Sequence, residues 1–560
     1  MPLNMSSSRH WQLILFLVIV SYVFLMAGNS VMSLTHPDEV FYVQTAKEMI
    51  ARHSWMTPYI FDEPQFEKPI LFYWLLIAAI KIFGLTPFAA RFFPAFFGMA
   101  AVVVIYWISW MLFRNKRISF LSGIILSSSF IHFALSRAVL IDMVFSVWVA
   151  VTLGFFYCGY HNPQRKNAGI ILAFVFSAIA VLTKGLLGFC FPAGVILIYL
   201  FLRRDISFLK SRAVLWGAFL FMLIVVPWHA LMIKLYGQAF THEYFQNVHI
   251  RRLLEAEHRK SNTWYFYPAT VILGVMPWTF FMFPAIALFI RKLREEGSAR
   301  SVFQFLLAWL IGIFIFVQPA QSKLASYILP IFPAVVILLA YYLQAGVSHR
   351  GFKIAGYGLT LFLLLTPVAA VIAVGKYRSF VPDIKPIFVG IILIAACGLA
   401  LLRFLLRDQR ERFIAAIPCV TLSLFIIAIS GKPYAEPWVS CRQISDVFKS
   451  TDASESVVLA SKFYVRGVRY YTDRPVAVID IAGHPFFSPH PIPFLSTDTD
   501  VDHFLRRQPA TFCVVKESDL EALKRIVMNG GFSMTPLRDI GGKHLLKIEN
   551  RMLSKKAIDN

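Results

Sequence analysis

The sequence has few charged residues for its length. Charged side chains make up 15% of the 560 residues, whereas a soluble globular chain carries roughly 25%. Hydrophobic residues make up 58%, and apolar runs of about 17–25 residues recur along most of the chain, each long enough to cross ~30 Å of hydrocarbon. The shortage of charge therefore excludes a soluble enzyme of this size and indicates a polytopic α-helical membrane protein.

Cysteine is also scarce, and no CxxC or Cys/His motif occurs. The six cysteines are Cys158, Cys190, Cys397, Cys419, Cys441 and Cys513. The first four lie in or beside apolar runs, so neither a disulfide framework nor a cysteine metal site is expected, and a Cys441–Cys513 bridge is left as an open alternative. Internal repeats and low-complexity tracts are missing as well, which argues against a repeat architecture.

Acidic residues are outnumbered by basic ones, 31 against 54, which gives a net charge of +23. In a soluble protein this excess would suggest nucleic acid as a partner. Here the basic residues stand mostly in short loops between apolar runs, which is the topology signal of membrane proteins. Membrane lipids, including anionic ones, are therefore the expected partners, and nucleic acid is not.

About thirteen membrane spans are predicted. They lie near 11–31, 87–112, 118–134, 143–159, 167–182, 186–202, 211–231, 268–290, 301–317, 325–344, 353–375, 385–405 and 412–430. The first run lacks a cleavage signal, so we expect a retained helix. Every second loop is basic, which places the N-terminus in the cytoplasm by the positive-inside rule, and an odd number of spans puts the tail outside.

The composition changes after about residue 432. Segments 456–461, 475–480 and 511–515 have the pattern of short buried strands, and 518–528 has that of a helix. We therefore expect residues 1–431 to form a transmembrane domain with outer-face loops 32–86 and 232–267. Residues 432–560 are expected to form a small soluble α/β domain on the outer, periplasmic face.

Acidic residues are predicted at two places on the outer face. Asp38 and Glu39 follow the first span, at the start of a predicted amphipathic helix over 40–53, and Asp142 stands in an apolar stretch at the outer end of the fourth span. An ionisable group in such a place is costly and is a functional candidate. The alternative for Asp38 is a helix cap, and the alternatives for Asp142 are an N-cap or a pair with Arg137.

Basic residues on the outer face also need an explanation, because the positive-inside rule does not supply one. They are Lys68, Lys184, Arg251, Arg252, Arg259 and Lys323. Phosphate groups of a lipid-linked substrate would explain them, since Lys and Arg bind phosphate strongly. The alternative is snorkelling to lipid headgroups.

Four histidines cluster in or near the second outer loop: His229, His242, His249 and His258. Glu67 with one of them can bind a divalent metal ion, although no ligand spacing requires it. The alternative for each is a surface or packing histidine.

The order of these motifs resembles a known family. An Asp-Glu pair after the first span, Glu67-Lys68-Pro69, the acid at 142, Thr183-Lys184-Gly185 and the segment Lys323–Pro330 follow one another as in the aminoarabinose transferases. These are GT-C glycosyltransferases related to protein O-mannosyltransferases, and they transfer a sugar from a polyprenyl-phosphate donor outside the cytoplasmic membrane. The resemblance covers nearly all of the chain.

The resemblance implies roles for individual residues. Asp38 and Asp142 are the expected catalytic carboxylates, and Glu67 with His249 is the expected metal pair, with His258 as the alternative to His249. The expected substrate-binding residues are Glu39, Tyr42, Lys68, Lys184, Arg251, Arg252, Lys323 and Tyr327. The chain departs from the family pattern at Phe41, Gln65, Val248 and Ala325, positions that bear on the identity of sugar and acceptor.

The implied function is transfer of a sugar, for example 4-amino-4-deoxy-L-arabinose, from polyprenyl phosphate to lipid A or a related envelope glycolipid at the cell inner membrane. A protein or other-glycan glycosyltransferase of the same fold is the alternative among enzymes. A flippase for lipid-linked sugars is the alternative of another class, but it should show paired inverted repeats and broken helices in both halves, and the sequence shows neither.

Overall fold

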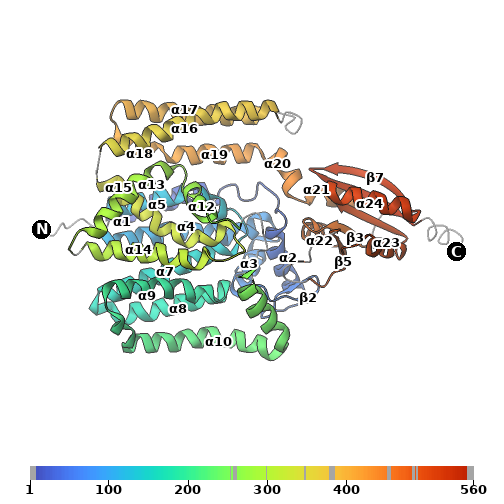
Figure 1. Ribbon diagram of the computed structural model, residues 1–560, viewed down its shortest axis with the longest axis horizontal. Helices are drawn as coiled ribbons and strands as arrows, with labels where there is room; N and C mark the ends of the chain where they lie inside the picture. Colours follow the sequence, from blue (N-terminus) through green and yellow to red (C-terminus); the bar gives the residue numbers. More distant parts are fainter. Residues whose placement is uncertain are drawn as a thin grey trace. The chain divides into compact units, whose positions relative to one another are not determined.

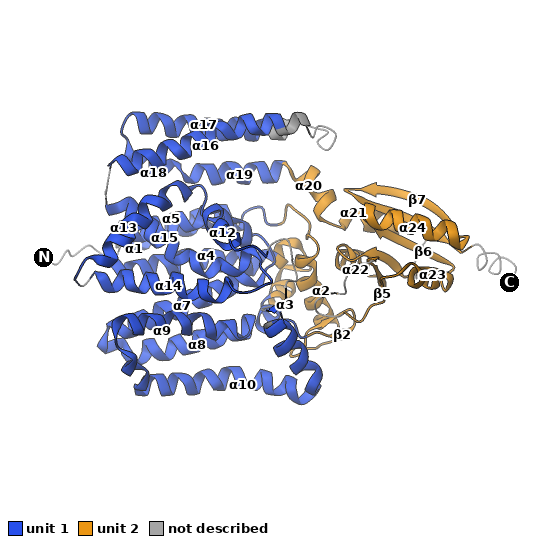
Figure 2. Ribbon diagram, viewed as in Figure 1, with its two compact units in different colours: residues 1–29, 66–75, 91–430 blue, residues 30–65, 76–90, 431–560 orange. Residues whose placement is uncertain are grey.

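The computed structural model describes residues 8–251, 254–255, 262–297, 299–345, 349–376, 385–450, 456–481, 483, 486 and 490–550. The chain divides into two compact units (Figure 2). The first consists of residues 1–29, 66–75 and 91–430, and the second of residues 30–65, 76–90 and 431–560. The division after residue 430 adjoins the predicted start of the tail, but the second unit also includes most of the first predicted outer loop.

Helices make up nearly all of the first unit (Figure 1). They are α1 Ser8–Ser21, η1 Tyr22–Met26, α4 Pro87–Phe113, α5 Lys116–Ser127, α6 Phe130–Ser136, α7 Ile141–His161, η2 Pro163–Arg165, α8 Lys166–Lys184, α9 Leu187–Arg203, η3 Ile206–Lys210, α10 Arg212–Thr241, η4 His242–Arg251, α12 Phe266–Gly274, η6 Trp278–Phe281, α13 Met282–Arg294, α14 Arg300–Val317, η7 Ala325–Ile331, α15 Phe332–Ala345, α16 His349–Lys376, α17 Lys385–Leu406, α18 Arg410–Ala416 and α19 Pro418–Ser430. Helices α3, Leu71–Phe83, and α4 have residues in both units.

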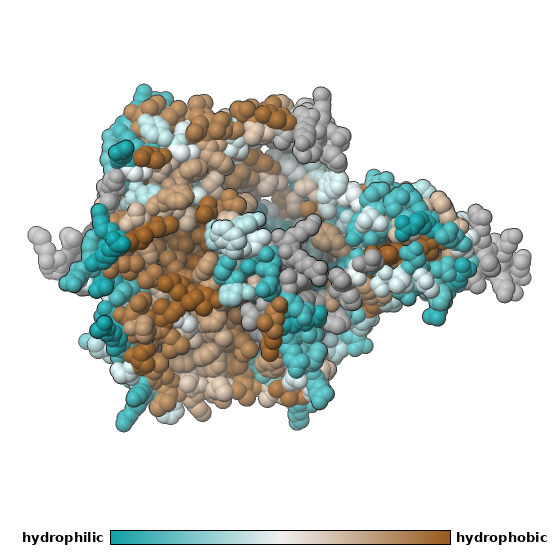
Figure 3. Space-filling model, in the orientation of Figure 1, coloured by the Kyte–Doolittle hydropathy of each residue, from teal (hydrophilic) through white to brown (hydrophobic). Residues whose placement is uncertain are grey.

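Nine helical segments among the described residues are long and apolar enough to cross a membrane, or eleven if each of two bent helix pairs counts as one span. Shorter apolar helices include His10–Met26 and Leu187–Arg203. Each of the thirteen predicted spans coincides with one of these segments, although the number of membrane crossings stays a prediction. Figure 3 shows a broad hydrophobic band over the helices of this unit, with hydrophilic side chains at the helix ends.

One bent pair has a cause that can be read from its side chains. Helices α5 and α6 meet at 61° around three consecutive serines. The hydroxyls of Ser127 and Ser128 donate to the carbonyl of Ile124, and that of Ser129 donates to the carbonyl of Ile125, at 2.6–3.0 Å. Serine hydroxyls that bond back to the preceding turn compete with the helical ladder and bend it.

The second bent pair, α12 with η6 and α13, turns by 108°. Pro277 stands at this break, and proline has no backbone N–H with which to continue a helix. The carbonyl of Met276 instead accepts a bond from the backbone N–H of Phe130 at 2.9 Å. The two breaks are thereby joined to each other.

Helices α7 and α8 form a tight hairpin around two glycines. A Cβ at Gly169 would stand 2.7 Å from the Cα of Gly159, so only glycine lets the two backbones approach this closely. The hairpin turns at η2, near Arg165. The start of α7 and the end of α8 therefore lie together at the opposite end of the helices.

The second unit contains a six-stranded sheet in the order β5-β4-β3-β6-β8-β7. Its strands are β3 Val458–Ser461, β4 Val476–Ile479, β5 Phe494–Leu495, β6 Ala510–Val515, β7 Ser533–Ile540 and β8 Lys543–Glu549. The first four are parallel, and β8 is antiparallel to both β6 and β7. Its helices are α2 Asp38–Ala51, α20 Lys432–Val439, α21 Arg442–Ser450, α22 Val465–Thr472, α23 Asp498–Arg506 and α24 Glu517–Gly530, and a small hairpin pairs β1 Tyr59–Ile60 with β2 Glu63–Pro64.

The three predicted strands and the predicted helix of the tail occur as β3, β4, β6 and α24. Strands β3 and β4 are buried along their whole length, which explains why continuous apolar runs marked them. The hairpin of β7 and β8 was not predicted, because most residues of β7 are partly or fully exposed and its sequence has no apolar run.

The amphipathic helix expected over 40–53 occurs as α2, and most of it is buried. Ten of its fourteen residues are buried, and they include the polar side chains of Glu39, Gln44, Thr45 and Glu48. Glu48 accepts hydrogen bonds from the backbone N–H groups of Phe61 and Asp62 at 3.1 and 3.0 Å. The loop after α2 therefore covers the side chain of Glu48.

Candidate active site

An ion pair links the two ends of the α7–α8 hairpin. The ammonium of Lys184, the last residue of α8, contacts Oδ1 of Asp142 in the first turn of α7. The side chains are only 8% and 6% exposed, respectively. A buried charge is tolerated only when it is paired and hydrogen-bonded, so each residue accounts for the presence of the other in an apolar region.

Two aromatic rings cover the ammonium of Lys184. Its Nζ lies 4.4 Å from the ring centroid of Tyr327 and 5.2 Å from that of Phe145. Ring faces attract cations, and more strongly where water is excluded. Tyr327 comes from η7, so three separate parts of the chain meet at this cation.

The alternative partner of Asp142, Arg137, is engaged elsewhere. Its guanidinium donates to the carbonyls of Phe24 and Ala27 at 3.1 and 2.8 Å. Asp142 does not cap α7 either, since the N-cap residue is Leu140. Lys184, which lies between the predicted spans 167–182 and 186–202, is the last residue of α8, and Gly185, with φ of 87°, ends the helix.

Lys323 is also buried, but its ammonium has protein partners. It donates to Oδ1 of Asn262 and to the carbonyl of Thr263, both at 3.2 Å, and the Asn262 amide in turn donates to Gln321. These bonds tie the segment before η7 to the segment before α12. The hydrogen bonds of Lys323 would therefore hold η7 in place, and with it Tyr327.

The remaining predicted residues of the first unit are placed only in part. Glu67 is buried and Lys68 is half-buried, whereas Arg251 is exposed and pairs with Glu255 at 2.7 Å. Arg252, His258 and Arg259 lie outside the described residues, as does the side chain of His249. Within the described part of the chain, no group of three or more His, Cys, Asp or Glu side chains is placed to hold a metal ion.

Three further predicted residues, Asp38, Glu39 and Tyr42, lie on α2 in the second unit. Asp38 is the first residue of the helix and is exposed, while Glu39 and Tyr42 are buried. The carboxylate of Glu39 accepts from both the backbone N–H and the hydroxyl of Thr35, at 2.8 and 2.9 Å. Glu39 thus fixes the chain that enters the helix. The joint catalytic role expected for Asp38 and Asp142 stays a prediction.

The segment that carries Asp38 is held by residues of the tail. The backbone N–H of His36 donates to the carbonyl of Val439 at 3.0 Å, and the His36 ring lies 3.7 Å from the sulfur of Cys441 and edge-on to Tyr464. Lys47 pairs with Asp473. We call this set of contacts, between residues 33–62 and residues 436–473, the clasp.

Burial gives the centre of the clasp unusual acid–base properties. It lowers the pKa of His36 to about 3, with the charge of Lys543 acting in the same direction. It also raises the pKa of the Cys441 thiol to about 12. His36 is therefore neutral and Cys441 is a thiol at pH 7. No disulfide forms, and all six cysteines are free. Sequence reasoning missed His36, because its partners stand about 400 residues away.

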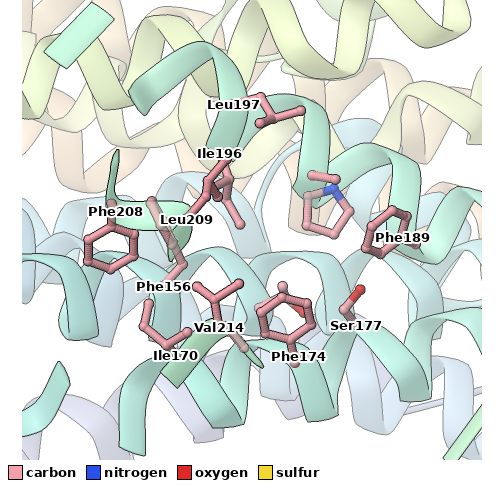
Figure 4. A pocket seen from close by; sticks show the side chains of 14 residues that line it. Phe156, Ile170, Phe174, Ser177, Phe189, Ile196, Leu197, Phe208, Leu209 and Val214 are labelled. Carbon is pink, nitrogen blue, oxygen red and sulfur yellow. The ribbon is translucent and has the colours of Figure 1, made fainter. Parts of the chain in front are cut away.

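An apolar cavity of about 180 Å³ lies between α7, α8, α9 and α10. Figure 4 shows that it is lined by side chains such as Phe156, Phe174, Phe189 and Leu197, with Ser177 at its edge. Its lining on α7 begins at Thr152, ten residues or about 15 Å along the helix from Asp142. With no charged residue in its lining, this cavity is not a site for a phosphate.

Comparisons with known proteins agree with these features. The family of dolichyl-phosphate-mannose-protein mannosyltransferases matches residues 11–242. An undecaprenyl phosphate-alpha-4-amino-4-deoxy-L-arabinose arabinosyl transferase of Yersinia pestis is 31% identical over 427 residues, which cover 74% of this chain and 74% of that protein. A protein of Aquifex aeolicus is 27% identical over 472 residues, 84% of this chain and 88% of that one.

Solved structures show the same fold. The crystal structure of ArnT from Cupriavidus metallidurans bound to undecaprenyl phosphate has a TM-score of 0.77 at 19% identity and covers 97% of this chain and 98% of that one. An oligosaccharyltransferase of Archaeoglobus fulgidus has a TM-score of 0.54 at 14% identity, over 95% of this chain and 70% of that one. The chain is a polytopic membrane protein of the GT-C fold, and by its similarity to the Yersinia enzyme it belongs to the aminoarabinose transferase family of glycosyltransferases.

Proposed function

We propose that this glycosyltransferase moves 4-amino-4-deoxy-L-arabinose from undecaprenyl phosphate to lipid A at the cell inner membrane. The names of its relatives support the sugar and the carrier, and lipid A is the acceptor that the resemblance implies. The observation that carries the proposal is the buried pair of Asp142 and Lys184 beneath Tyr327. It supplies a desolvated cation next to a carboxylate at one end of the helices.

The chemistry requires stabilisation of a departing phosphate. The acceptor oxygen attacks the anomeric carbon, the bond from that carbon to the phosphate oxygen breaks, and undecaprenyl phosphate leaves with an additional negative charge. An ammonium in a water-excluded site stabilises that charge much more than it would in water. We assign this role to Lys184, assisted by Lys68, with Tyr42 and Tyr327 lining the sugar site.

Asp142 then has a defined role before and during the reaction. In the absence of donor it holds the ammonium of Lys184 in place, since an unpaired ammonium at this depth would be too costly. An incoming phosphate takes over part of the contact with Lys184. Asp38 positions the acceptor, or takes its proton if the acceptor is a hydroxyl instead of an ionised phosphate.

We further propose the expected topology. Thirteen spans place the N-terminus in the cytoplasm. They place the loop that carries Asp38 and Glu67, together with the soluble α/β domain of residues 432–560, on the periplasmic side. The ends of α7 and α8 that carry Asp142 and Lys184 are opposite the basic turn at Arg165, which agrees with a site on the outer face.

A divalent metal ion at Glu67 and His249 also remains a proposal. Metal analysis of the purified protein and of a His249→Ala variant tests it, since a resident ion should be lost with the ligand. An equal metal content in both proteins would contradict it.

Mass spectrometry of lipid A tests the function. Cells with the protein should add aminoarabinose to lipid A phosphates, and cells with Asp38→Asn should not. Purified enzyme with synthetic donor then separates the alternatives. Transfer to lipid A in detergent supports the proposal, transfer only to a peptide or another glycan favours the related enzymes, and movement of intact donor across vesicles without transfer indicates a flippase.

A further inference from the structure

A second cavity in the first unit is lined by polar residues at one end, which we call its mouth, and by apolar residues along the rest. It has a volume of about 530 Å³ and lies between α1, α5 and the α18–α19 segment, beside the end of α15. Lys116, Arg117, Gln344 and Glu411 are its polar lining residues. We refer to it as the α1–α5 groove. Its volume is within the range of protein sites for small molecules.

The three lining segments all start at the same end of the groove. Along α5 the lining passes from Lys116 to Ile124, and along α18 and α19 it passes from Glu411 to Leu422. Apolar residues follow the polar ones at helical spacing in both segments, so each presents one face to the cavity. The lining of the groove therefore changes along its length, from charged residues at the mouth to apolar residues beyond it.

The length of the groove matches one leaflet of a bilayer. Its lining on α1 and η1 extends from Leu13 to Phe24, eleven residues or about 16 Å. That is about half of the ~30 Å of hydrocarbon in a membrane. At the inner end Phe24 packs in a cluster with Leu25 and Phe133, against which Leu422 also packs. An acyl chain that enters at the mouth would end at this cluster.

The mouth has an unsatisfied positive charge. The Nζ atom of Lys116 is buried and has no hydrogen-bond partner among the described residues. Lys116 and Arg117 are also the first two residues of α5, where the helix dipole favours an anion and where no acidic residue occurs. The Asn115 side chain already accepts from two backbone N–H groups of this turn. An anion at the mouth would therefore be bound by the two basic side chains.

Among the described residues, none supplies this anion. Glu411, the acidic residue of the lining, stands in the first turn of α18, where its own helix dipole stabilises it, and it makes no hydrogen bond to Lys116. Residues 1–7, which lie outside the described part, contain no acidic side chain. The donor phosphate is also excluded, because α5 and α6 cross from this mouth to the end where Asp142 stands.

We infer that the α1–α5 groove binds an anionic glycerophospholipid, with its phosphate at Lys116 and Arg117 and one acyl chain along α1 toward Phe24. The orientation proposed above assigns this lipid to the cytoplasmic leaflet. The lipid is a separate ligand from donor and acceptor. The lipid fills the space between the first predicted span and the last, two segments that are far apart in the sequence.

Native mass spectrometry of the full-length protein from nanodiscs tests the inference. Nanodiscs with equal phosphatidylglycerol and phosphatidylcholine should yield protein that retains phosphatidylglycerol. The double variant Lys116→Gln/Arg117→Gln should retain at least about tenfold less, because the loss of even one charge-assisted hydrogen bond has an effect of that size. Arg165→Gln, an exposed cation at the same end of the helices, should retain as much as wild type.

A second variant tests the apolar part of the groove without altering its mouth. Ala415→Trp fills the cavity beside Ile414 and should also displace phosphatidylglycerol. If the double variant fails to fold, Ala415→Trp decides alone. Equal retention of both lipids by wild type, unchanged retention in a folded variant, or displacement of the lipid by inorganic phosphate alone would each overturn the inference.

Discussion

Removal of one partner of the buried Asp142–Lys184 pair leaves an uncompensated charge in an apolar region. Both side chains are less than a tenth exposed, so solvent screens little of the effect. Breaking a buried pair in this way costs about 3–5 kcal/mol of unfolding free energy. Asp142→Asn and Lys184→Gln should each lower the stability of the detergent-purified protein by that amount, as measured by thermal or SDS-induced unfolding.

The double variant separates a structural pair from a catalytic one. Asp142→Asn/Lys184→Gln has no buried charge and retains an amide–amide contact, so it should recover most of the lost stability. Transfer should not recover, because the departing phosphate has lost its ammonium. A charge-assisted contact of about 1.5–3 kcal/mol corresponds to a loss of about 10- to 150-fold in kcat/KM.

The control is an exposed pair at the other end of the helices. Lys292 contacts Glu295 at 2.5 Å on the surface, and Lys292→Gln should change stability by about 0.5 kcal/mol or less and leave transfer unchanged. A double variant of Asp142 and Lys184 that transfers sugar at the wild-type rate would refute the reasoning, and the pair would then be a device for packing α7 against α8.

Three further predictions concern the second unit and the topology. Asp38→Asn removes only charge and should abolish transfer while the thermal unfolding midpoint stays unchanged; near-normal turnover would reduce Asp38 to the first residue of a helix. A periplasm-dependent reporter fused at the C-terminus should be active, and activity of a cytoplasm-dependent reporter alone would reverse the proposed orientation. The neutral, buried His36 should make the clasp less stable as pH falls from about 6.5 toward about 3, because the unfolded chain takes up a proton that the folded one refuses. The stability of the clasp, measured by hydrogen exchange, should fall by at most about 1.4 kcal/mol per pH unit. If a His36→Gln variant keeps the full pH dependence, another group is responsible for it.

The membrane helices could be predicted because length and hydrophobicity alone decide whether a segment crosses a bilayer. Their breaks could not be predicted in the same way. At Ser127–Ser129 the helix bends because three hydroxyls bond back to carbonyls of the preceding turn, and that outcome depends on side-chain rotamers instead of hydrophobic period.

The candidate site shows a similar limit. The sequence identified Asp142 as an ionisable residue in an apolar stretch and Lys184 as a basic residue on the outer face, and a tight hairpin brings the two together. It offered Arg137 as a possible partner of Asp142 and did not consider Lys184. The carbonyls of Phe24 and Ala27 that engage Arg137 stand more than 100 residues away in the sequence. The sequence did not predict that most of α2 is buried, since the residues that hold its loop belong to the tail.

The clasp also has a consequence for biosynthesis. His36 and Cys441 stand 405 residues apart, and at about 5–20 residues per second a ribosome needs roughly 20–80 s to pass from one to the other. During that interval the helix that carries Asp38 is already made but lacks the residues that hold it. A nascent chain thus inserts all of its spans before this part of the enzyme can assemble, so a truncated or stalled product would not carry the finished Asp38 segment.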